Sequence, residues 1–420
     1  MKKIFENRHL KENKKKYTYG SIGIFLIILG WFAVPPLMSV SYNANNQTKN
    51  LNLVNGVVES ADAISEEAWE PIYIGTPENV KSIYMTSCVA GTPSFRDDLV
   101  NIVQTTEVNS IIIDIKDFSG GISFDAGNPL LKPYISNRCG ASDMKEFIYS
   151  LNKKGIYVIG RITVFQDPLY SVNHPEISVQ KASDRSIWSD NKGIHYLDPG
   201  AEKYWQYILE LSKESYKIGF DELNFDYIRF PSDGPMKDIY YPISEKVINT
   251  NPETGKAKVI KSFFEFLNKE LREGLNIPIS ADLFGMTTTN KDDLNIGQLL
   301  EDALSYFDYV APMVYPSHYP ANFNGWDNPN DHVYDVVNFS MQSAYNRAVE
   351  YSEATSTPAF IRNRVSPKQL RTWIQDFDYG GNYDISEVRA EIQASYDAGV
   401  NSWMIWSPSN RYTIGALEKE

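Results

Sequence analysis

The chain has 420 residues, 42% of them hydrophobic, and can therefore bury one large core or two modest ones. Its net charge of −13 comprises +5 over residues 1–16 and −18 over the remainder, which argues against nucleic acid or an anionic membrane as the main partner of the acidic body. Aromatic residues make up 13% of the chain, and because aromatic faces stack on sugar rings the composition leans towards carbohydrate, although core packing also uses such residues.

The N-terminal segment has the pattern of a membrane anchor or a secretory signal peptide. Residues 17–40 contain no charged residue and follow the basic residues 1–16, so the positive-inside rule places the rest of the chain outside the cytoplasm. The uncharged stretch is long enough to cross a bilayer, which favours an uncleaved anchor, while Ser39-Val40-Ser41 leaves cleavage open. Residues 41–76, polar and without periodicity, predict a linker to a domain at 77–420.

In residues 77–420 strand-like runs alternate with helix-like runs, several of which end at a glycine. No GxGxxG or P-loop fingerprint follows the first strand, so the pattern predicts an α/β fold, a single (β/α)₈ TIM barrel. The predicted strands are Ser82–Thr86, Ser110–Lys116, Ile156–Thr163, Phe220–Tyr227, Ile279–Phe284, Tyr309–Tyr315, Leu370–Phe377 (or, for this seventh strand, Pro358–Ile361) and Ser402–Trp406. The predicted helices are Phe95–Thr105, Asp143–Lys153, Ala201–Lys217, Lys261–Glu273, Ile296–Tyr306, Val333–Tyr351 and Ser386–Ala398.

Two cysteines, Cys88 and Cys139, form either a disulfide or two buried free thiols, and their separation does not fit a zinc site. The sequence therefore indicates no metal and no cofactor. Two insertions, Phe165–Pro199 and Ser232–Val259, follow predicted strand ends and are candidate substrate-binding loops.

The fourth predicted strand lies in the stretch GFDELNFDYIRFP, Gly219 to Pro231. Its polar residues Glu222, Asn224 and Asp226 alternate with Leu223 and Phe225, which places them on one face of the strand. Strands between two helices are usually buried on both faces, where an unpaired carboxylate is costly. A row of polar residues at the carboxyl end of such a strand therefore points to an active site.

Further polar and aromatic side chains follow the other predicted strand ends. Asp226 and Asp282, at the ends of neighbouring strands, are the predicted catalytic pair, because glycoside hydrolysis needs one proton donor and one ionised carboxylate. The alternative is a structural role, in which such carboxylates form buried ion pairs with Arg or Lys. Arg229 is expected to pair with Asp226 and keep it ionised. Asp221 and Asp308 begin strands, so a stability role on the lower face is expected. The predicted substrate contacts are Asp114, Lys116, Asp117, Arg161, Arg229, Tyr315, His318, Gln375 and Trp406.

Seven motifs occur in order between about residue 80 and residue 416: SIYMTS, IIIDIKD, FDELNFDYIRFPSDG, ISADLFG, VAPMVYPSHY, LRTWIQDF and SWMIWSPSNRYT. In these the chain resembles a bacterial glycoside hydrolase family first described as a domain of unknown function. GFDELNFD is also similar to the fourth strand of family 18 chitinases, but their acidic glutamate would fall at Ile228, so their substrate-assisted mechanism is not supported. The α-amylase-like pattern implies Asp226 as nucleophile and Asp282 as acid, with Asp in place of Glu and Asn224 in place of Arg.

The expectation is an extracytoplasmic glycosidase that acts on a cell-surface or secreted polysaccharide or oligosaccharide. A catalytically inactive glycan-binding barrel in cell-envelope assembly is the alternative. Polysaccharide deacetylation would require a metal site, for which the sequence has no close Asp/His triad. Linkage, stereochemical outcome and oligomeric state stay open.

Overall fold

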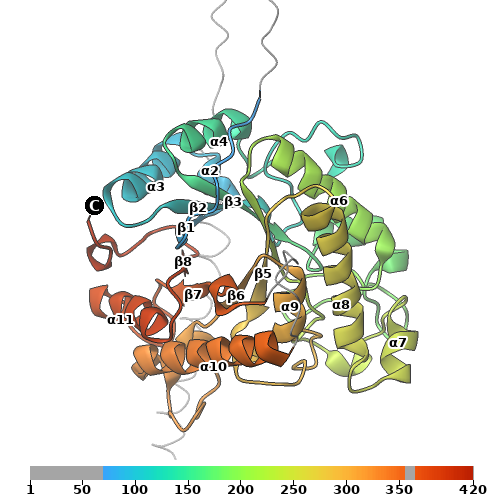
Figure 1. Cartoon of the computed structure of the whole chain (residues 1–420). Helices are drawn as coiled ribbons and strands as arrows, with labels where there is room; N and C mark the ends of the chain where they lie inside the picture. Colours follow the sequence, from blue (N-terminus) through green and yellow to red (C-terminus); the bar gives the residue numbers. More distant parts are fainter. Residues whose placement is uncertain (1–69, 355–364, 420) are drawn as a thin grey trace, which may run out of the picture. The chain divides into compact units, whose positions relative to one another are not determined.

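The computed structural model describes residues 70–354 and 365–419. Eight parallel strands close into a barrel in chain order, with helices around them (Figure 1). Each strand overlaps its predicted counterpart, which confirms the single (β/α)₈ barrel. The strands are β1 (Lys81–Met85), β2 (Ser110–Lys116), β3 (Tyr157–Thr163), β4 (Glu222–Asp226), β5 (Ile279–Phe284), β6 (Tyr309–Met313), β7 (Thr372–Gln375) and β8 (Trp403–Trp406).

A helix connects each pair of consecutive strands, as predicted, but some helices begin or end at other residues than predicted. The helix predicted at Lys261–Glu273 begins earlier, at Gly255, and its last turns are π-helical over Asn268–Glu273. Part of the Ser232–Val259 insertion is therefore helical. The principal helices are α2 (Ser87–Ala90), α3 (Pro93–Thr105), α4 (Met144–Lys153), α5 (Pro168–Asn173), α6 (Glu202–Lys217), α7 (Glu245–Thr250), α8 (Gly255–Leu267), α9 (Leu300–Tyr306), α10 (Val333–Ala354) and α11 (Ile385–Asp397).

Several predictions lie outside the described residues. These are the basic tail, membrane segment and most of the linker, at residues 1–69, and the alternative seventh strand Pro358–Ile361. Within residues 70–354 and 365–419, no helix is both long and apolar enough to span a bilayer.

The strands separate two buried layers, as their alternating side chains require. In β2, Ile111 and Ile113 pack in the large cluster between strands and helices, whereas Ile112 belongs to the smaller cluster inside the barrel. Inside the barrel Arg371, which immediately precedes β7, forms a bidentate ion pair with Glu222, at 2.6 and 3.0 Å. Glu222 is therefore used in an ion pair inside the barrel. Asn224 and Asp226 are the polar residues at the carboxyl end of β4.

Acidic residues at the lower end of the barrel hold backbone groups. Asp221 accepts hydrogen bonds from the backbone N–H groups of Ile74 and Val158, at 2.6 and 2.8 Å. Asp308 pairs with Arg272 at 2.7 Å and also accepts from the backbone N–H of Ile279 at 3.0 Å. These contacts fit the stability role predicted for both carboxylates.

A disulfide joins the chain segments after β1 and β2. Cys88 lies on α2, and Cys139 lies in the long connection between β2 and α4. Of the two alternatives that the sequence left open, the structure has the disulfide.

Candidate active site

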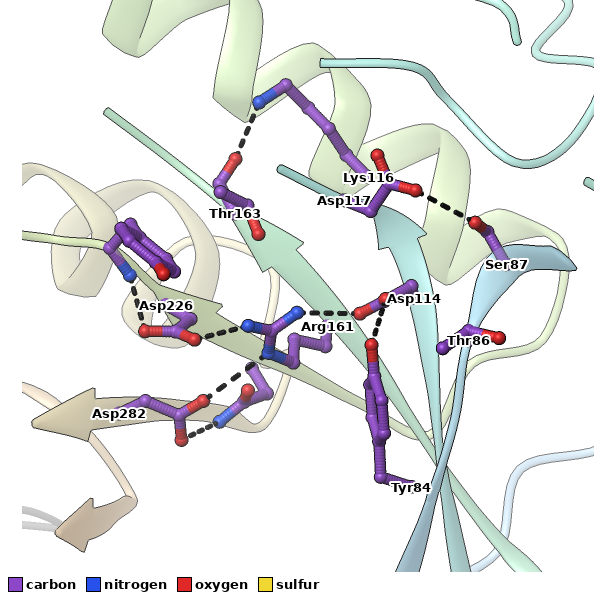
Figure 2. Close-up of polar contacts among 12 residues, drawn as sticks. Tyr84, Thr86, Ser87, Asp114, Lys116, Asp117, Arg161, Thr163, Asp226 and Asp282 are labelled. Carbon is purple, nitrogen blue, oxygen red and sulfur yellow. Dashed lines mark hydrogen bonds and ion pairs between the residues drawn. The ribbon is translucent and has the colours of Figure 1, made fainter. Parts of the chain in front are cut away.

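One guanidinium, that of Arg161 on β3, lies among three carboxyl groups from β2, β4 and β5 (Figure 2). It pairs with Asp114 of β2 at 2.7 Å and with Asp226 of β4, and its Nε lies 3.8 Å from the carboxyl group of Asp282 on β5. The strand register explains the cluster, because Asp114 and Arg161 are directly paired and Asp226 lies two residues beyond the partner of Arg161 on β4. Four residues that are far apart in sequence therefore form one charged site.

Asp282 is the most enclosed of the three carboxyl groups, with 1% of its surface exposed. Its Oδ1 accepts hydrogen bonds from Asn224 Nδ2 at 2.9 Å and from Trp373 Nε1 at 2.7 Å, while its Oδ2 has no hydrogen-bond partner among the described residues. Burial, followed by the negative charge of Asp226, raises the pKa of Asp282 to about 8 against the opposing effect of Arg161. At neutral pH the group is therefore protonated, and Oδ2 is the oxygen free to carry the proton.

Within the described chain, both carboxyl oxygens of Asp226, unlike those of Asp282, have hydrogen-bond partners. One oxygen pairs with Arg161, and the other accepts a hydrogen bond from the backbone N–H of Tyr227 at 2.5 Å. Tyr227 has a φ of 51°, a left-handed conformation that is uncommon for a bulky residue and occurs preferentially at functional sites. The expected pair with Arg229 does not form, because that guanidinium donates instead to the carbonyl of Phe230 at 3.1 Å and to Ser232 Oγ at 3.0 Å.

A cavity of about 1200 Å³ opens over the carboxyl ends of β1 to β4 and β8. Asp114 and Arg161 are part of its lining. Other lining residues include Asp117, Tyr227, Arg229, Trp406, Cys88 and Cys139. Burial raises the pKa of Asp114 to about 6, although Arg161 and the hydroxyl of Tyr84, which donates to it, oppose this. Asp226 and Asp282 do not line the cavity but lie against Arg161, which does.

Comparison with known families decides the class of this barrel. A family model described as "Putative glycosyl hydrolase domain" matches residues 82–412. The chain belongs to this family. The Arg161 cluster and the cavity above it both lie within the matched region of the glycosyl hydrolase domain.

Two solved structures with TM-scores above 0.5 share the barrel fold of this domain. The glycoside hydrolase domain of PgaB (BpsB) from Bordetella bronchiseptica is 13% identical, with a TM-score of 0.55 over 80% of this chain and 95% of that one. An α-L-fucosidase isoenzyme 2 from Paenibacillus thiaminolyticus is also 13% identical, with a TM-score of 0.51 over 80% of this chain and 48% of the fucosidase. A hypothetical protein from Ruminiclostridium thermocellum is 28% identical over 48% of this chain and 96% of its own, with a TM-score of 0.41. A comparison with curated protein sequences gives no significant match.

Two of the predicted substrate contacts, Lys116 and Gln375, are buried and do not line the cavity. Lys116 is fully buried, where it pairs with Asp167 at 3.0 Å and donates to the carbonyl of Thr163 at 2.6 Å. Gln375 is also fully buried and accepts a hydrogen bond from Ser317 Oγ at 2.6 Å. Both side chains hold neighbouring segments of the barrel together in this structure.

Tyr315, His318 and Trp406 form an aromatic group at the carboxyl ends of β6 and β8. The Tyr315 ring lies 5.1 Å from Trp406 and 5.3 Å from His318, centroid to centroid. Burial, and then the charge of Lys192, lower the pKa of His318. Of the three, Trp406 lines the cavity, and Tyr315 is nearly fully buried behind it.

Sequence reasoning missed Tyr84 and Trp373, and it placed Asn224 on the polar face of the fourth strand without pairing it with Asp282. The hydrogen bonds of these residues to Asp114 and Asp282 come from side chains that point into the barrel. The alternation of β4 predicts the face on which Asn224 lies, but Trp373 stands in the mixed run LRTWIQDF, where nothing marks its indole as the partner of a carboxyl group. Of the two insertions, Phe165–Pro199 lines much of one cavity wall, whereas Ser232–Val259 contributes only Asp233.

The part of the chain that the structure describes contains no set of side chains suited to binding a metal ion. No group of three or more His, Cys, Asp or Glu side chains there is arranged to hold an ion.

Proposed function

We propose that this protein is an extracytoplasmic, membrane-tethered glycoside hydrolase that cleaves a cell-surface or secreted polysaccharide with Asp226 and Asp282. The observation that carries the proposal is the contrast between these neighbouring carboxyl groups. Asp226 is paired with a guanidinium, whereas Asp282 has a pKa raised to about 8 and an oxygen without a hydrogen-bond partner in the described chain. Two carboxyl groups in different protonation states are what glycoside hydrolysis requires.

In this mechanism Asp282 donates its proton to the glycosidic oxygen as the bond to the anomeric carbon breaks. The carboxylate of Asp226 stabilises the positive charge that develops on the sugar, or bonds to the anomeric carbon before water releases the product. Both groups contact Arg161, so the sugar must move the Arg161 side chain to reach them from the cavity. Asn224 and Trp373 hold Asp282 through Oδ1, which leaves Oδ2 to act.

The proposed location is supported by the N-terminal charge pattern and by the disulfide. Residues 1–16 are basic and residues 17–40 uncharged, which is the order expected for a cytoplasmic tail and an anchor. The Cys88–Cys139 disulfide fits an oxidising compartment outside the cytoplasm.

A second candidate, a glycan-binding barrel without catalysis, is favoured by one specific observation. Asp226 and Asp282 are only 4% and 1% exposed, and the cavity reaches Arg161 and Asp114 but not these two groups. In that case Arg161 would remain paired with Asp226, and the aromatic residues around the cavity would bind the sugar.

The test is to incubate the full-length chain, in mild detergent, with a panel of bacterial surface glycans and to measure new reducing ends. Wild type is expected to generate them, and Asp226→Asn is expected to bind the same glycan without cleaving it. Binding without reducing ends in the wild type would favour the inactive barrel. Wild-type activity in both Asp226→Asn and Asp282→Asn would overturn the assignment and direct attention to Asp114 or Asp117.

A further inference from the structure

A second hollow lies outside the barrel mouth, along α10. It has a volume of about 520 Å³ and shares no lining residue with the main cavity. One wall is a face of α10 itself, and the other is formed by the segment after β5 and the loop after β6, which contribute Lys291, Asn324 and Trp326. We refer to this hollow as the α10 groove.

The α10 residues in the groove follow helical spacing. Asp335, Asn338, Gln342, Asn346 and Glu350 stand three or four positions apart, which places them on one face of the helix. At 1.5 Å per residue this face is about 22 Å long. Its length suits an extended chain better than a single small molecule.

Aromatic rings form one end of the groove. Phe339 is 40% exposed although it stands on a packed helix, and its ring meets that of Trp326 edge-on at a centroid distance of 6.2 Å. The other neighbours of Trp326 include His332, stacked at 5.6 Å, which fixes the indole in place. An exposed, rigid aromatic corner beside polar side chains offers a stacking surface for a sugar ring.

The rest of the groove is rich in amides and carries no net charge. Asn338, Gln342 and Asn346 follow one another at four-residue spacing, and Gln342 Nε2 donates to Asn346 Oδ1 at 3.2 Å. Amide side chains both donate and accept, which matches the hydroxyl groups of a sugar. The two cations among the lining residues, Lys291 and Arg347, are equal in number to the two anions, and Arg347 is already bound to Glu301 at 2.6 Å.

We propose that the α10 groove is a second binding site, which holds a segment of an uncharged polysaccharide. The connection after β6 joins the two sites, since Tyr315 and His318 at its start lie beside Trp406 of the main cavity and Trp326 further along it lines the groove. A polymer bound along α10 is thereby kept close to the barrel mouth. The inference shares its ligand class with the proposed function, but binding in the groove requires no catalysis at Asp226.

The test is affinity electrophoresis of the full-length chain, in mild detergent, through native gels that contain soluble glucomannan, arabinoxylan or alginate. All forms carry Asp226→Asn, so that any hydrolysis cannot shorten the polymer. Glucomannan or arabinoxylan is expected to retard the protein, and Phe339→Ala and Asn346→Ala are each expected to weaken the apparent affinity about tenfold. Both positions are exposed on the helix surface, so folding is preserved, as an unchanged melting temperature will verify.

The matched control is Tyr334→Ala, which removes an exposed aromatic ring of the same helix that bonds to Asp397 on α11, outside the groove. This variant should migrate as the parent does. Absence of retardation in both neutral gels, equal retardation of the Phe339→Ala variant, or retardation by alginate alone would each overturn the proposal. Dimers in sedimentation analysis that dissociate on Phe339→Ala would also overturn it, by identifying the groove as a contact between copies. Absence of reducing-end release by the wild type, with this binding retained, would count against the proposed function only.

Discussion

The guanidinium of Arg161 organises the chemistry of the candidate active site. It provides one positive charge for three enclosed carboxyl groups, those of Asp114, Asp226 and Asp282. All three cannot be ionised at low cost, because a buried charge without a partner is strongly unfavourable. The carboxyl group farthest from the guanidinium, Asp282, is the one whose pKa rises to about 8.

The raised pKa of Asp282 predicts how stability depends on pH. Between the usual carboxyl pKa of 3.8 and about 8, the unfolded chain releases this proton while the folded protein retains it, so Asp282 makes wild-type stability fall as pH rises. The side-chain amide of the Asp282→Asn variant cannot ionise. The melting temperature of this variant relative to wild type should therefore increase from pH 5 to pH 8 and level off above. A difference that is constant over this range would contradict the protonated state of Asp282.

Replacing the guanidinium should be costly. Arg161→Met leaves Asp226 and Asp114 enclosed without their cation, and the free energy of unfolding at pH 7 is expected to fall by about 3–5 kcal/mol. The loss should be smaller at pH 5, because the unpaired carboxyl groups are protonated more readily there. Arg229→Met is the matched control, since its contacts are one carbonyl, one hydroxyl and the Tyr227 ring. Chemical denaturation of both variants at the two pH values measures these effects, and equal losses would show that Arg161 is not the central cation.

The candidate carboxylates could be read from the sequence, but their partners could not. Asp226 and Asp282 follow from strand alternation and strand order. The assignment of Arg229 as partner failed because β4 ends at Asp226 and Tyr227 turns the chain with a φ of 51°, after which alternation no longer gives the direction of a side chain. Arg161 lies on the neighbouring strand β3, and its pairing depends on the register between strands, which periodicity does not reveal.

The elements themselves were largely predictable. Runs of apolar residues such as Ile111 to Ile113, together with glycines after helices, gave all eight strands. Gly155 and Gly399 have φ values of 73° and 84°, as helix ends require. The start of α8 was missed because Lys256 and Lys258 alternate with the buried Ala257 and Val259, which hides the helical period. The short α7 contains no buried residue and so has no apolar stripe to detect.

The disulfide ties α2 to the β2–α4 connection, and both cysteines line the main cavity. Replacing both with Ser is expected to lower the free energy of unfolding by about 2–4 kcal/mol, because the unfolded chain gains the freedom of a 51-residue separation. Turnover per folded molecule should persist, since neither sulfur contacts the three carboxylates. Denaturation curves combined with activity at a temperature where the double variant is folded check both statements, and loss of turnover in that folded variant would contradict the second.

For the molecule as a whole, the basic residues 1–16 and the acidic remainder predict opposite sides of a membrane. Protease added to intact cells should remove the barrel and leave a short membrane-bound fragment. An epitope placed before residue 17 should be cut only after the cells are opened. Full protection of the barrel in intact cells would contradict the proposed orientation.

The proposed roles of Asp226 as ionised carboxylate and Asp282 as proton donor are tested most directly by varying the leaving group of the substrate. Wild type, Asp226→Asn and Asp282→Asn are compared on an unactivated oligosaccharide, chosen from the glycan that yields reducing ends, and on the corresponding dinitrophenyl glycoside, whose leaving group needs little protonation. Asp282→Asn is expected to lose about 10²–10⁴-fold in kcat/KM on the oligosaccharide and far less on the dinitrophenyl glycoside, while Asp226→Asn loses activity on both. Equal losses of Asp282→Asn on the two substrates would contradict its role as proton donor.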